Sequence, residues 1–285
     1  MTEKDFSPLL SDIKLTALDL DGTLLTTDKQ LTVRTRNALR NAAEHGIIPV
    51  FVTGRPYSGL PEELLDIPGC RYAITSNGAV TTDILTGAVM RASVLNPETA
   101  AQIAQIPLER GLLYNIFIDG IGYSDYSTFE QLVNRFSGTP LEKYVLQSRR
   151  GTDDILDFIK KSGDSAENIW IMCSDTCERD EIHDMILKYP SVRTVLTAKT
   201  DIEVGAQDAD KGLALKEFAG MLHIPEKNIL AIGDNMNDLG MLKAAGTAVV
   251  MGNAPEEVRQ YSDIIADSND CDGAAKILEM ITQSP

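Results

Sequence analysis

The sequence predicts an α/β fold: a core with a parallel sheet and helices on both faces, split by an inserted α+β domain. At both ends of the chain, short apolar runs alternate with helix-like stretches, a pattern typical of a parallel sheet covered by helices. The middle of the chain breaks this rhythm, and 285 residues are sufficient for two domains. We therefore assign residues 1–87 and 195–285 to the core and residues 88–194 to the inserted domain.

The first part of the core is expected to contain three strands and two helices. Thr32 suits the N-cap of the first helix because its hydroxyl can accept from free N–H groups, and Gly46 suits the end of that helix. Pro49 lacks an N–H group, so it predicts an irregular start or an edge position for the second strand. The expected strands are residues 14–20, 47–52 and 72–75, and the expected helices are residues 32–45 and 60–65.

The same alternation returns near the C-terminus. In the middle, helix-like stretches accompany apolar strands, which indicates an α+β arrangement. The expected strands of the middle are residues 114–118 and 169–172. The expected strands of the last part are residues 228–232 and 248–251, and its expected helices are residues 211–222, 237–245 and 274–281.

Charge and composition disfavour several classes of function. The chain has 26 basic and 42 acidic residues, a net charge of −16, whereas nucleic acids and anionic membranes are bound by clustered Lys and Arg. We find no apolar run that could span a bilayer and no apolar signal core, so we expect a cytoplasmic protein. The four cysteines fit free thiols, since Cys173 and Cys177 lack the second Cys/His pair of a zinc site.

Two acids follow the first expected strand. Asp19 and Asp21 stand two residues apart, with Gly22 and Thr23 completing a tight turn. Ligands of open parallel sheets bind outside the carboxyl ends of the strands. Two carboxylates at such a place repel each other unless a cation or protons intervene, and oxygen ligands suit magnesium.

Three further segments place polar groups at strand ends or helix starts. Thr53 and Gly54 follow the second strand, where a hydroxyl and backbone N–H groups can form an anion site. Lys211 opens a helix, which opposes the helix dipole and so invites a functional reason such as a phosphate contact. Asp234 follows a late strand, and Asp238 lies one helical turn further on. Each segment alone is also typical of an ordinary polar turn, but together they supply a nucleophile, a metal site and cationic donors for phosphoryl transfer.

In this order, DLDGTLL, VTGR, DKG and GDNMND resemble the four motifs of the haloacid dehalogenase-like phosphatase superfamily. The resemblance covers essentially the whole chain and implies a Rossmann-like core. The insertion resembles the large α+β cap of the Cof-type subfamily, as do residues 76–79, 252–254 and 269–273. The motif acids, threonine and lysine are all present, so the resemblance implies an active phosphatase.

The resemblance also implies a role for each motif residue. Asp19 would attack phosphorus and become an aspartyl phosphate, while Asp21 would protonate the leaving alcohol and then activate water. Magnesium would be held by the Asp19 carboxylate, the Asp21 backbone carbonyl and Asp234, with Asn235 contributing directly or through water. Asp238 would orient Lys211 or a metal-bound water. The phosphoryl oxygens would be held by Thr53, Lys211, Asn237 and the backbone N–H groups of Leu20 and Gly54.

The expected partner is a small phosphate monoester, with sugar phosphates favoured for a Cof-type enzyme and pyridoxal phosphate or flavin mononucleotide still open. A phosphomutase acting on a sugar phosphate is the first alternative, because such enzymes share the motifs and the cap class. A binding or regulatory protein is less expected because the motifs are intact, and no G-x-G-x-x-G follows the first strand as in dinucleotide-binding proteins. The sequence does not determine the oligomeric state.

Specificity is expected to reside in the cap. Tyr114, Tyr123, Asp125 and Tyr126 are candidate substrate contacts, although aromatic residues more often fill cores. Arg149 and Arg150 could attract a second anionic group, with a solvated surface pair as the alternative.

Overall fold

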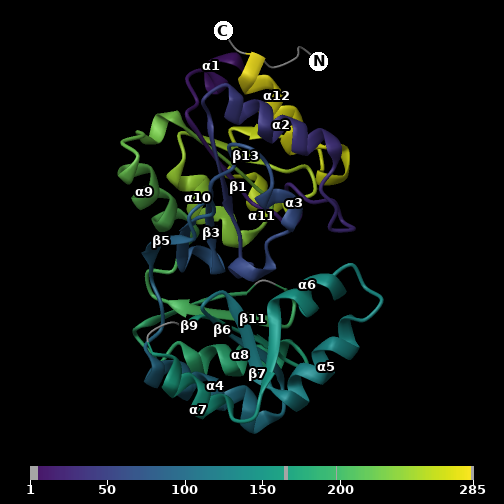
Figure 1. The fold of residues 1–285 in the computed structure, drawn as a ribbon, viewed down its shortest axis with the longest axis vertical. Coiled ribbons are helices and arrows are strands. Elements are labelled where there is room, and N and C mark those ends of the chain that lie inside the picture. Colours follow the sequence, from purple (N-terminus) through teal and green to yellow (C-terminus); the bar gives the residue numbers. More distant parts are fainter. Residues whose placement is uncertain (1–5, 164–165, 197, 284–285) are drawn as a thin grey trace.

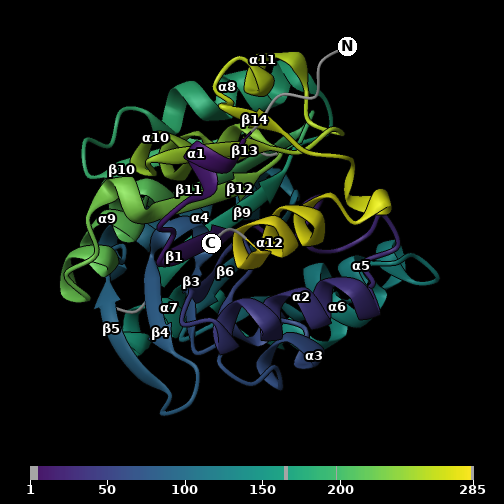
Figure 2. The same ribbon diagram turned by 90° about the horizontal axis from the view of Figure 1, so that it is seen from above.

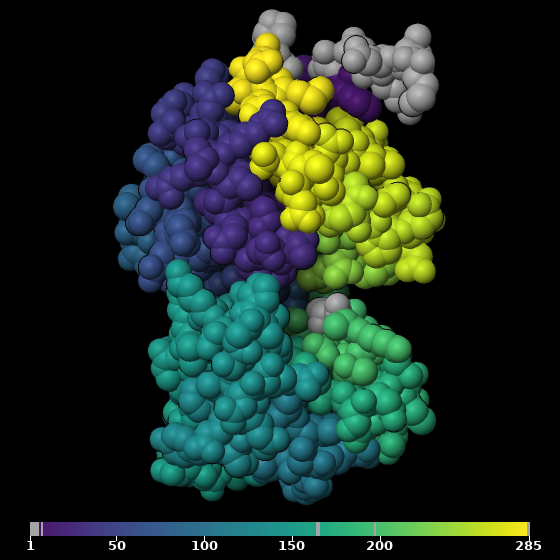
Figure 3. Space-filling model, turned by 90° about the vertical axis from the view of Figure 1, so that its right-hand side faces the viewer, coloured from purple at the N-terminus to yellow at the C-terminus, as the bar shows by residue number. Residues whose placement is uncertain are grey.

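A computed structural model describes residues 6–163, 166–196 and 198–283. The chain forms two bodies, a core and a cap, which lie one above the other in Figure 1. It begins in the core, passes through the cap and returns to the core, as the sequence predicted. A space-filling view shows a notch between the two bodies on one side of the molecule (Figure 3).

The core is built on a sheet with the strand order β14-β13-β12-β1-β2-β3-β4-β5. Neighbouring strands from β14 to β3 run parallel, whereas β3, β4 and β5 form an antiparallel edge. The core strands are β1 (Leu15–Leu18), β2 (Ile48–Val52), β3 (Tyr72–Thr75), β4 (Val80–Asp83), β5 (Ala88–Ala92), β12 (Ile229–Gly233), β13 (Thr247–Val250) and β14 (Ile264–Ile265).

Helices cover both faces of the core sheet, as predicted (Figure 2). Successive strand residues point to opposite faces, so Phe51 packs in the apolar cluster with Leu39 of α2, and Val50 packs in the cluster with Phe218 of α9. α2 and α12 lie side by side on the first face. The core helices are α1 (Ser7–Leu10), α2 (Val33–Glu44), α3 (Glu62–Leu65), α9 (Lys211–Met221), α10 (Leu239–Ala244), α11 (Glu256–Arg259) and α12 (Gly273–Gln283).

The cap is a second sheet with helices packed against it. Its strand order is β10-β11-β9-β6-β7-β8, antiparallel throughout except for the parallel β7–β8 pair. Its strands are β6 (Leu113–Ile118), β7 (Ile121–Asp125), β8 (Arg149–Thr152), β9 (Ala166–Met172), β10 (Val192–Val195) and β11 (Asp201–Ala206). Its helices are α4 (Pro97–Arg110), α5 (Tyr126–Phe136), α6 (Glu142–Ser148), α7 (Ile155–Ser162) and α8 (Thr176–Ile186).

Sheet membership corrects both expected domain boundaries. We expected the cap to begin at residue 88, but β5 pairs with β4 and extends the core sheet to residue 92. We expected the cap to end at residue 194, but β11 lies between β9 and β10 in the cap sheet and carries the cap to residue 206. In β11, residues Ile202, Val204 and Ala206 are buried in the cap core, so their packing marks β11 as a cap strand.

The expectation of an edge position at Pro49 was wrong, because β2 lies between β1 and β3. The missing N–H group is tolerated because of register. Pairing with β3 begins only at Val50, which lies opposite Tyr72, so the backbone at Pro49 has no β3 partner to donate to.

In the part of the chain that the structure describes, no helix is long and apolar enough to cross a membrane. The cytoplasmic location stays a prediction from the sequence.

Candidate active site

Three parallel core strands end at the edge of the sheet that faces the cap (Figure 1). β1 lies between β12 and β2, and the residues that follow these strands begin with Asp19, Asp234 and Thr53. Lys211, the first residue of α9, reaches the same place. The topology therefore brings together groups that are spread over more than two hundred residues of sequence.

Lys211 joins two of these motifs through buried ion pairs. Its Nζ donates to Asp19 Oδ1 at 2.7 Å and to Asp238 Oδ1 at 2.6 Å, and the residue is 1% exposed. Burial alone would lower the pKa of Lys211, but the charges of both carboxylates outweigh it and raise that pKa. Burial and repulsion from Asp238 raise the pKa of Asp19 well above its usual value, against the opposing effect of Lys211. The lysine is thus a fixed cation beside Asp19.

Asp238 orients this lysine and shapes the loop after β12. Its Oδ1 accepts from Lys211, and its Oδ2 accepts from the backbone N–H groups of Asp234 and Asn235 at 2.9 and 3.0 Å. Since both oxygens are used and the side chain is fully buried, Asp238 suits an orienting role better than that of a metal ligand.

The acidic cluster fits a divalent cation. Asp19, Asp234 and Asp238 each place a carboxylate oxygen within 4.8 Å of the others, and in the described ranges the ion pairs of this cluster involve Lys211 alone. Burial and the nearby Asp238 raise the pKa of Asp234 to about 7. The cluster therefore carries more negative charge than Lys211 balances, and oxygen donors of this kind suit magnesium.

The glycine after Asp21 lets the first loop approach Asp234. Gly22 has a φ of +87°, and a Cβ at this position would lie 2.3 Å from Asp234 Oδ2. Thr23 donates its hydroxyl to Asp234 Oδ1 at 3.3 Å. The turn that the sequence predicted from Gly22 and Thr23 thus positions an acid that lies more than two hundred residues away.

Asp21 is held by two cations that the sequence analysis did not assign. Arg55 donates from Nε and Nη2 to the two Asp21 oxygens at 2.6 and 2.7 Å, and Lys29 Nζ lies 2.9 Å from Oδ1. Burial would raise the pKa of Asp21, but these cations outweigh it and lower that pKa to about 2. The Arg55 guanidinium also lies 4.7 Å from the ring centroid of the cap residue Tyr144. Arg55 could have been found from its place in VTGR, whereas Lys29 carries no such signal.

The loop that follows β2 contacts Asn77, whose role the sequence did not reveal. Thr53 is buried and its Oγ1 accepts from the N–H of Arg55, while a Cβ on Gly54 would lie 3.0 Å from Asn77 Oδ1. The same Asn77 oxygen accepts from Asn237 Nδ2 at 3.2 Å. Asn77 therefore links two of the predicted phosphate-binding segments.

The remaining predicted residues lie at the same loops. Leu20 is buried, and its carbonyl accepts from the N–H groups of Thr23 and Leu25, which closes the turn after β1. Asn235 Oδ1 accepts from the N–H of Met236 and caps the short turn after β12. The N–H of Leu20 as a phosphate donor and Asn235 as a metal ligand stay predictions.

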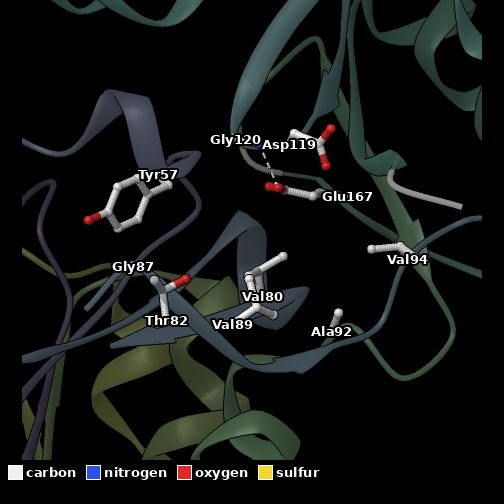
Figure 4. Close-up of a pocket in the computed structure, with 10 residues that line it drawn as sticks. All are labelled: Tyr57, Val80, Thr82, Gly87, Val89, Ala92, Val94, Asp119, Gly120 and Glu167. Atoms are coloured by element: carbon white, nitrogen blue, oxygen red, sulfur yellow. Dashed lines mark hydrogen bonds between the residues drawn. The ribbon is translucent and has the colours of Figure 1, made fainter. Parts of the chain in front are cut away.

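Hydrogen bonds hold the cap over these loops. Ser76 donates to Glu167 Oε2 at 2.6 Å, and the N–H of Gly120 donates to Glu167 Oε1 at 2.7 Å. Figure 4 shows Glu167 and Gly120 on the cap side of a cavity whose other wall is formed by the core. Asn77 donates to the cap residue Glu203, so the loop that contacts Asn237 also reaches the cap.

The four cap residues that we considered as substrate contacts have packing roles instead. Tyr114 is fully buried and donates to Asp125, which caps α5. The rings of Tyr123 and Phe158 pack against each other at a tilt of 41°, with centroids 4.4 Å apart. Tyr126 is exposed and packs against Gly151. None of the four lines the cap cavity that borders Gly54.

Both Cys173 and Cys177 are free thiols, as the sequence predicted.

The fold and the loops that follow its strands identify the family to which this chain belongs. The sequence model of the haloacid dehalogenase-like hydrolase family matches residues 16–278, and the chain belongs to this family. The predicted resemblance is thereby confirmed, and relatives that are named phosphatases confirm the predicted enzyme class.

Individual relatives match over nearly the whole chain. Phosphatase YwpJ of Bacillus subtilis (strain 168) is 28% identical, and the match covers 94% of this chain and 99% of YwpJ. The 5-amino-6-(5-phospho-D-ribitylamino)uracil phosphatase YcsE of the same organism is 28% identical over 94% of this chain and 95% of its own. The solved structure of a haloacid dehalogenase-like hydrolase from B. subtilis is 26% identical, has a TM-score of 0.82, and covers 94% of this chain and 99% of its own.

Proposed function

We propose that this chain is a magnesium-dependent phosphatase that hydrolyses small phosphate monoesters through an aspartyl phosphate on Asp19. The observation that carries the proposal is the buried cluster at the strand ends. In it, Lys211 bridges Asp19 and Asp238, and Asp234 stands beside them. Phosphoryl transfer depends on positioning and on electrostatic stabilisation, and this cluster supplies both.

In the first step, Asp19 forms a bond to phosphorus and the bond between phosphorus and the ester oxygen breaks. Because Lys211 occupies Oδ1 of Asp19, we assign the attack to Oδ2. Lys211, the Thr53 hydroxyl and the N–H groups of Leu20 and Gly54 would bind the phosphoryl oxygens, with Asn237 as a further contact. Magnesium, held by Asp19, Asp234 and the backbone carbonyl of Asp21, would neutralise charge between two anions.

Asp21 would serve both proton transfers. In the observed arrangement Asp21 is ionised and bound by Arg55 and Lys29. The ionised form can accept a proton from the water that attacks the phosphorus of the aspartyl phosphate, which releases phosphate and restores Asp19. To donate a proton to the leaving alcohol in the first step, Asp21 must be protonated and must move away from these cations.

The substrate is proposed to be a sugar phosphate or another small phosphate ester. The relative YcsE is named for a phosphate ester with a ribityl chain and a uracil ring, which supports a small organic phosphate as the substrate class. Product analysis distinguishes the phosphomutase alternative: an isomeric sugar phosphate would indicate a mutase, whereas free sugar and phosphate would indicate a hydrolase.

The test is phosphate release from p-nitrophenyl phosphate and a panel of sugar phosphates, with magnesium and after chelation. We expect release that depends on magnesium and falls by at least about a thousandfold in Asp19→Asn, as loss of a nucleophile does elsewhere. Asp66→Asn, which changes an exposed carboxylate, is the matched control and should retain full activity. Near-normal turnover in Asp19→Asn, or full turnover after exhaustive chelation, would refute the proposal.

A further inference from the structure

A cavity of about 250 Å³ lies between the loop at Gly54 and the cap sheet. Gly54 borders it from the core side, so the cavity begins where the proposed phosphoryl site ends. Its cap wall includes Phe117, Arg149, Trp170 and Glu203. On the proposed function, the organic part of the substrate would enter this space, because the phosphoryl group occupies the loops beside Gly54.

Arg149, at the start of β8, is a buried cation on the wall of this cavity. It is 6% exposed. Its Nε donates to Asn115 Oδ1 at 2.7 Å and its Nη1 donates to Ser148 Oγ at 2.7 Å, while Nη2 lies 3.4 Å from the hydroxyl of Tyr144. The guanidinium also lies 4.5 Å from the Tyr144 ring centroid and 5.4 Å from that of Phe117. These contacts fix its position but carry no negative charge.

In the described part of the chain, no carboxylate forms an ion pair with Arg149. Buried charges in proteins are normally paired, because removing a charge from water costs several kcal/mol unless an opposite charge compensates it. The five N–H groups of a guanidinium are also more than these three neutral contacts use. Arg149 is thus a fixed cation with donors to spare beside the space for the leaving group.

The neighbouring wall of the cavity carries carboxylates instead of a cation. Asp201 accepts from Trp170 Nε1 at 3.0 Å, and Glu203 accepts from Asn168 Nδ2 at 2.9 Å. Both carboxylates line the same cavity as Arg149. Carboxylates accept hydrogen bonds from hydroxyl or amino groups, so this wall suits a polar, hydrogen-donating part of a ligand.

We propose that the preferred substrate is a phosphate monoester whose organic part carries a second anionic group, which binds Arg149, and hydroxyl groups, which bind Asp201 and Glu203. A carboxylate or a second phosphate would match the flat guanidinium through paired N–H···O contacts. This inference rests on the proposed function, because the position of the leaving group follows from Asp19 and Gly54. It makes Arg149 a specificity-determining residue.

The test compares matched pairs of substrates that differ in one anionic group. 6-Phosphogluconate differs from sorbitol 6-phosphate by a carboxylate in place of a terminal alcohol, and 3-phosphoglycerate differs from glycerol 3-phosphate in the same way. Fructose 1,6-bisphosphate and fructose 6-phosphate form the pair for a second phosphate. In the wild type, kcat/KM should be higher for the pair member with the second anionic group. We expect a ratio of roughly 10- to 100-fold in at least one pair, which is the range for hydrogen bonds to a charged group.

Variants of Arg149 separate specific binding from general charge. Arg149→Gln should bring the ratio within each pair close to one, mainly through KM, and Arg149→Lys should restore part of it. Arg150→Gln removes the neighbouring exposed arginine and should leave both the ratio and the activity unchanged. Circular dichroism checks that the variants are folded. If Arg149→Gln fails to fold, the kcat/KM ratios of the wild type and of Arg149→Lys still test whether Arg149 selects the second anionic group.

The outcomes distinguish this inference from the proposed function. If the wild type releases no phosphate from p-nitrophenyl phosphate or from any pair, the proposed function fails and the inference with it. If it releases phosphate with ratios near one in all pairs, the inference alone is overturned. A preference that persists in Arg149→Gln, or that disappears in Arg150→Gln, would also overturn it.

Discussion

Replacing Asp234 by asparagine should make the metal-free protein more stable and remove its response to magnesium. Asp234 lies in the acidic cluster, and its pKa is raised to about 7, mainly by burial and then by Asp238, from a usual value of 3.8. A rise of this size corresponds to about 4 kcal/mol between the two protonation states.

The sign of the pH dependence follows from the raised pKa. Between pH 3.8 and about 7 the folded protein keeps a proton on Asp234 that the unfolded chain releases, so stability falls as the pH rises through this window. Above about pH 7 the penalty is complete. The amide introduced by Asp234→Asn cannot ionise, so the variant should lack this contribution and should exceed the wild type at pH 8 by up to about 4 kcal/mol, or on the order of 5–10 °C in Tm.

Magnesium should narrow this difference in stability. At a concentration about 100 times Kd, a ligand that binds only the folded state adds about 2.7 kcal/mol. We expect this gain in the wild type and little of it in Asp234→Asn. The assay is thermal unfolding at pH 5 and pH 8, with chelator and with magnesium, and Asp66→Asn serves as the exposed-carboxylate control. A variant that is less stable than the wild type in chelator at pH 8, with an unchanged magnesium shift, would refute the charge-excess reasoning.

Two further predictions concern α9. Gly212→Ala should destabilise the protein by about 1–3 kcal/mol in urea unfolding, because its Cβ would lie 2.2 Å from the backbone oxygen of Gly240 on α10. Gly220→Ala in the same helix has nothing within 4 Å and should stabilise by about 0.5–1 kcal/mol, so equal effects of the two variants would contradict the packing argument. Lys211→Met should cost about 3–5 kcal/mol in metal-free unfolding, since it leaves two buried carboxylates without their cation. A neutral effect of Lys211→Met would contradict the ion-pair argument.

The sequence alone indicated the core and most of the cluster, because both depend on local patterns. Buried runs that alternate with helical stretches predict a parallel sheet, and acids directly after such runs must lie at its carboxyl edge. Asp19 and Asp234 could therefore be placed at one edge before their contacts were known. The same reasoning could not place β11, since its alternation of buried and half-buried residues fits a strand of either sheet.

The tertiary structure alone decided which groups touch. Arg55 and Lys29 hold Asp21, and Asn77 joins the loop at Gly54 to the cap. Arg149 lines a cavity beside Gly54, and no carboxylate of the described residues forms an ion pair with it. Such contacts depend on side-chain reach and on how the two bodies close, and neither leaves a periodic signal in the sequence. The physical reason is range: hydrophobic periodicity is set by near neighbours in the chain, whereas Lys211 and Asp19 meet across 192 residues.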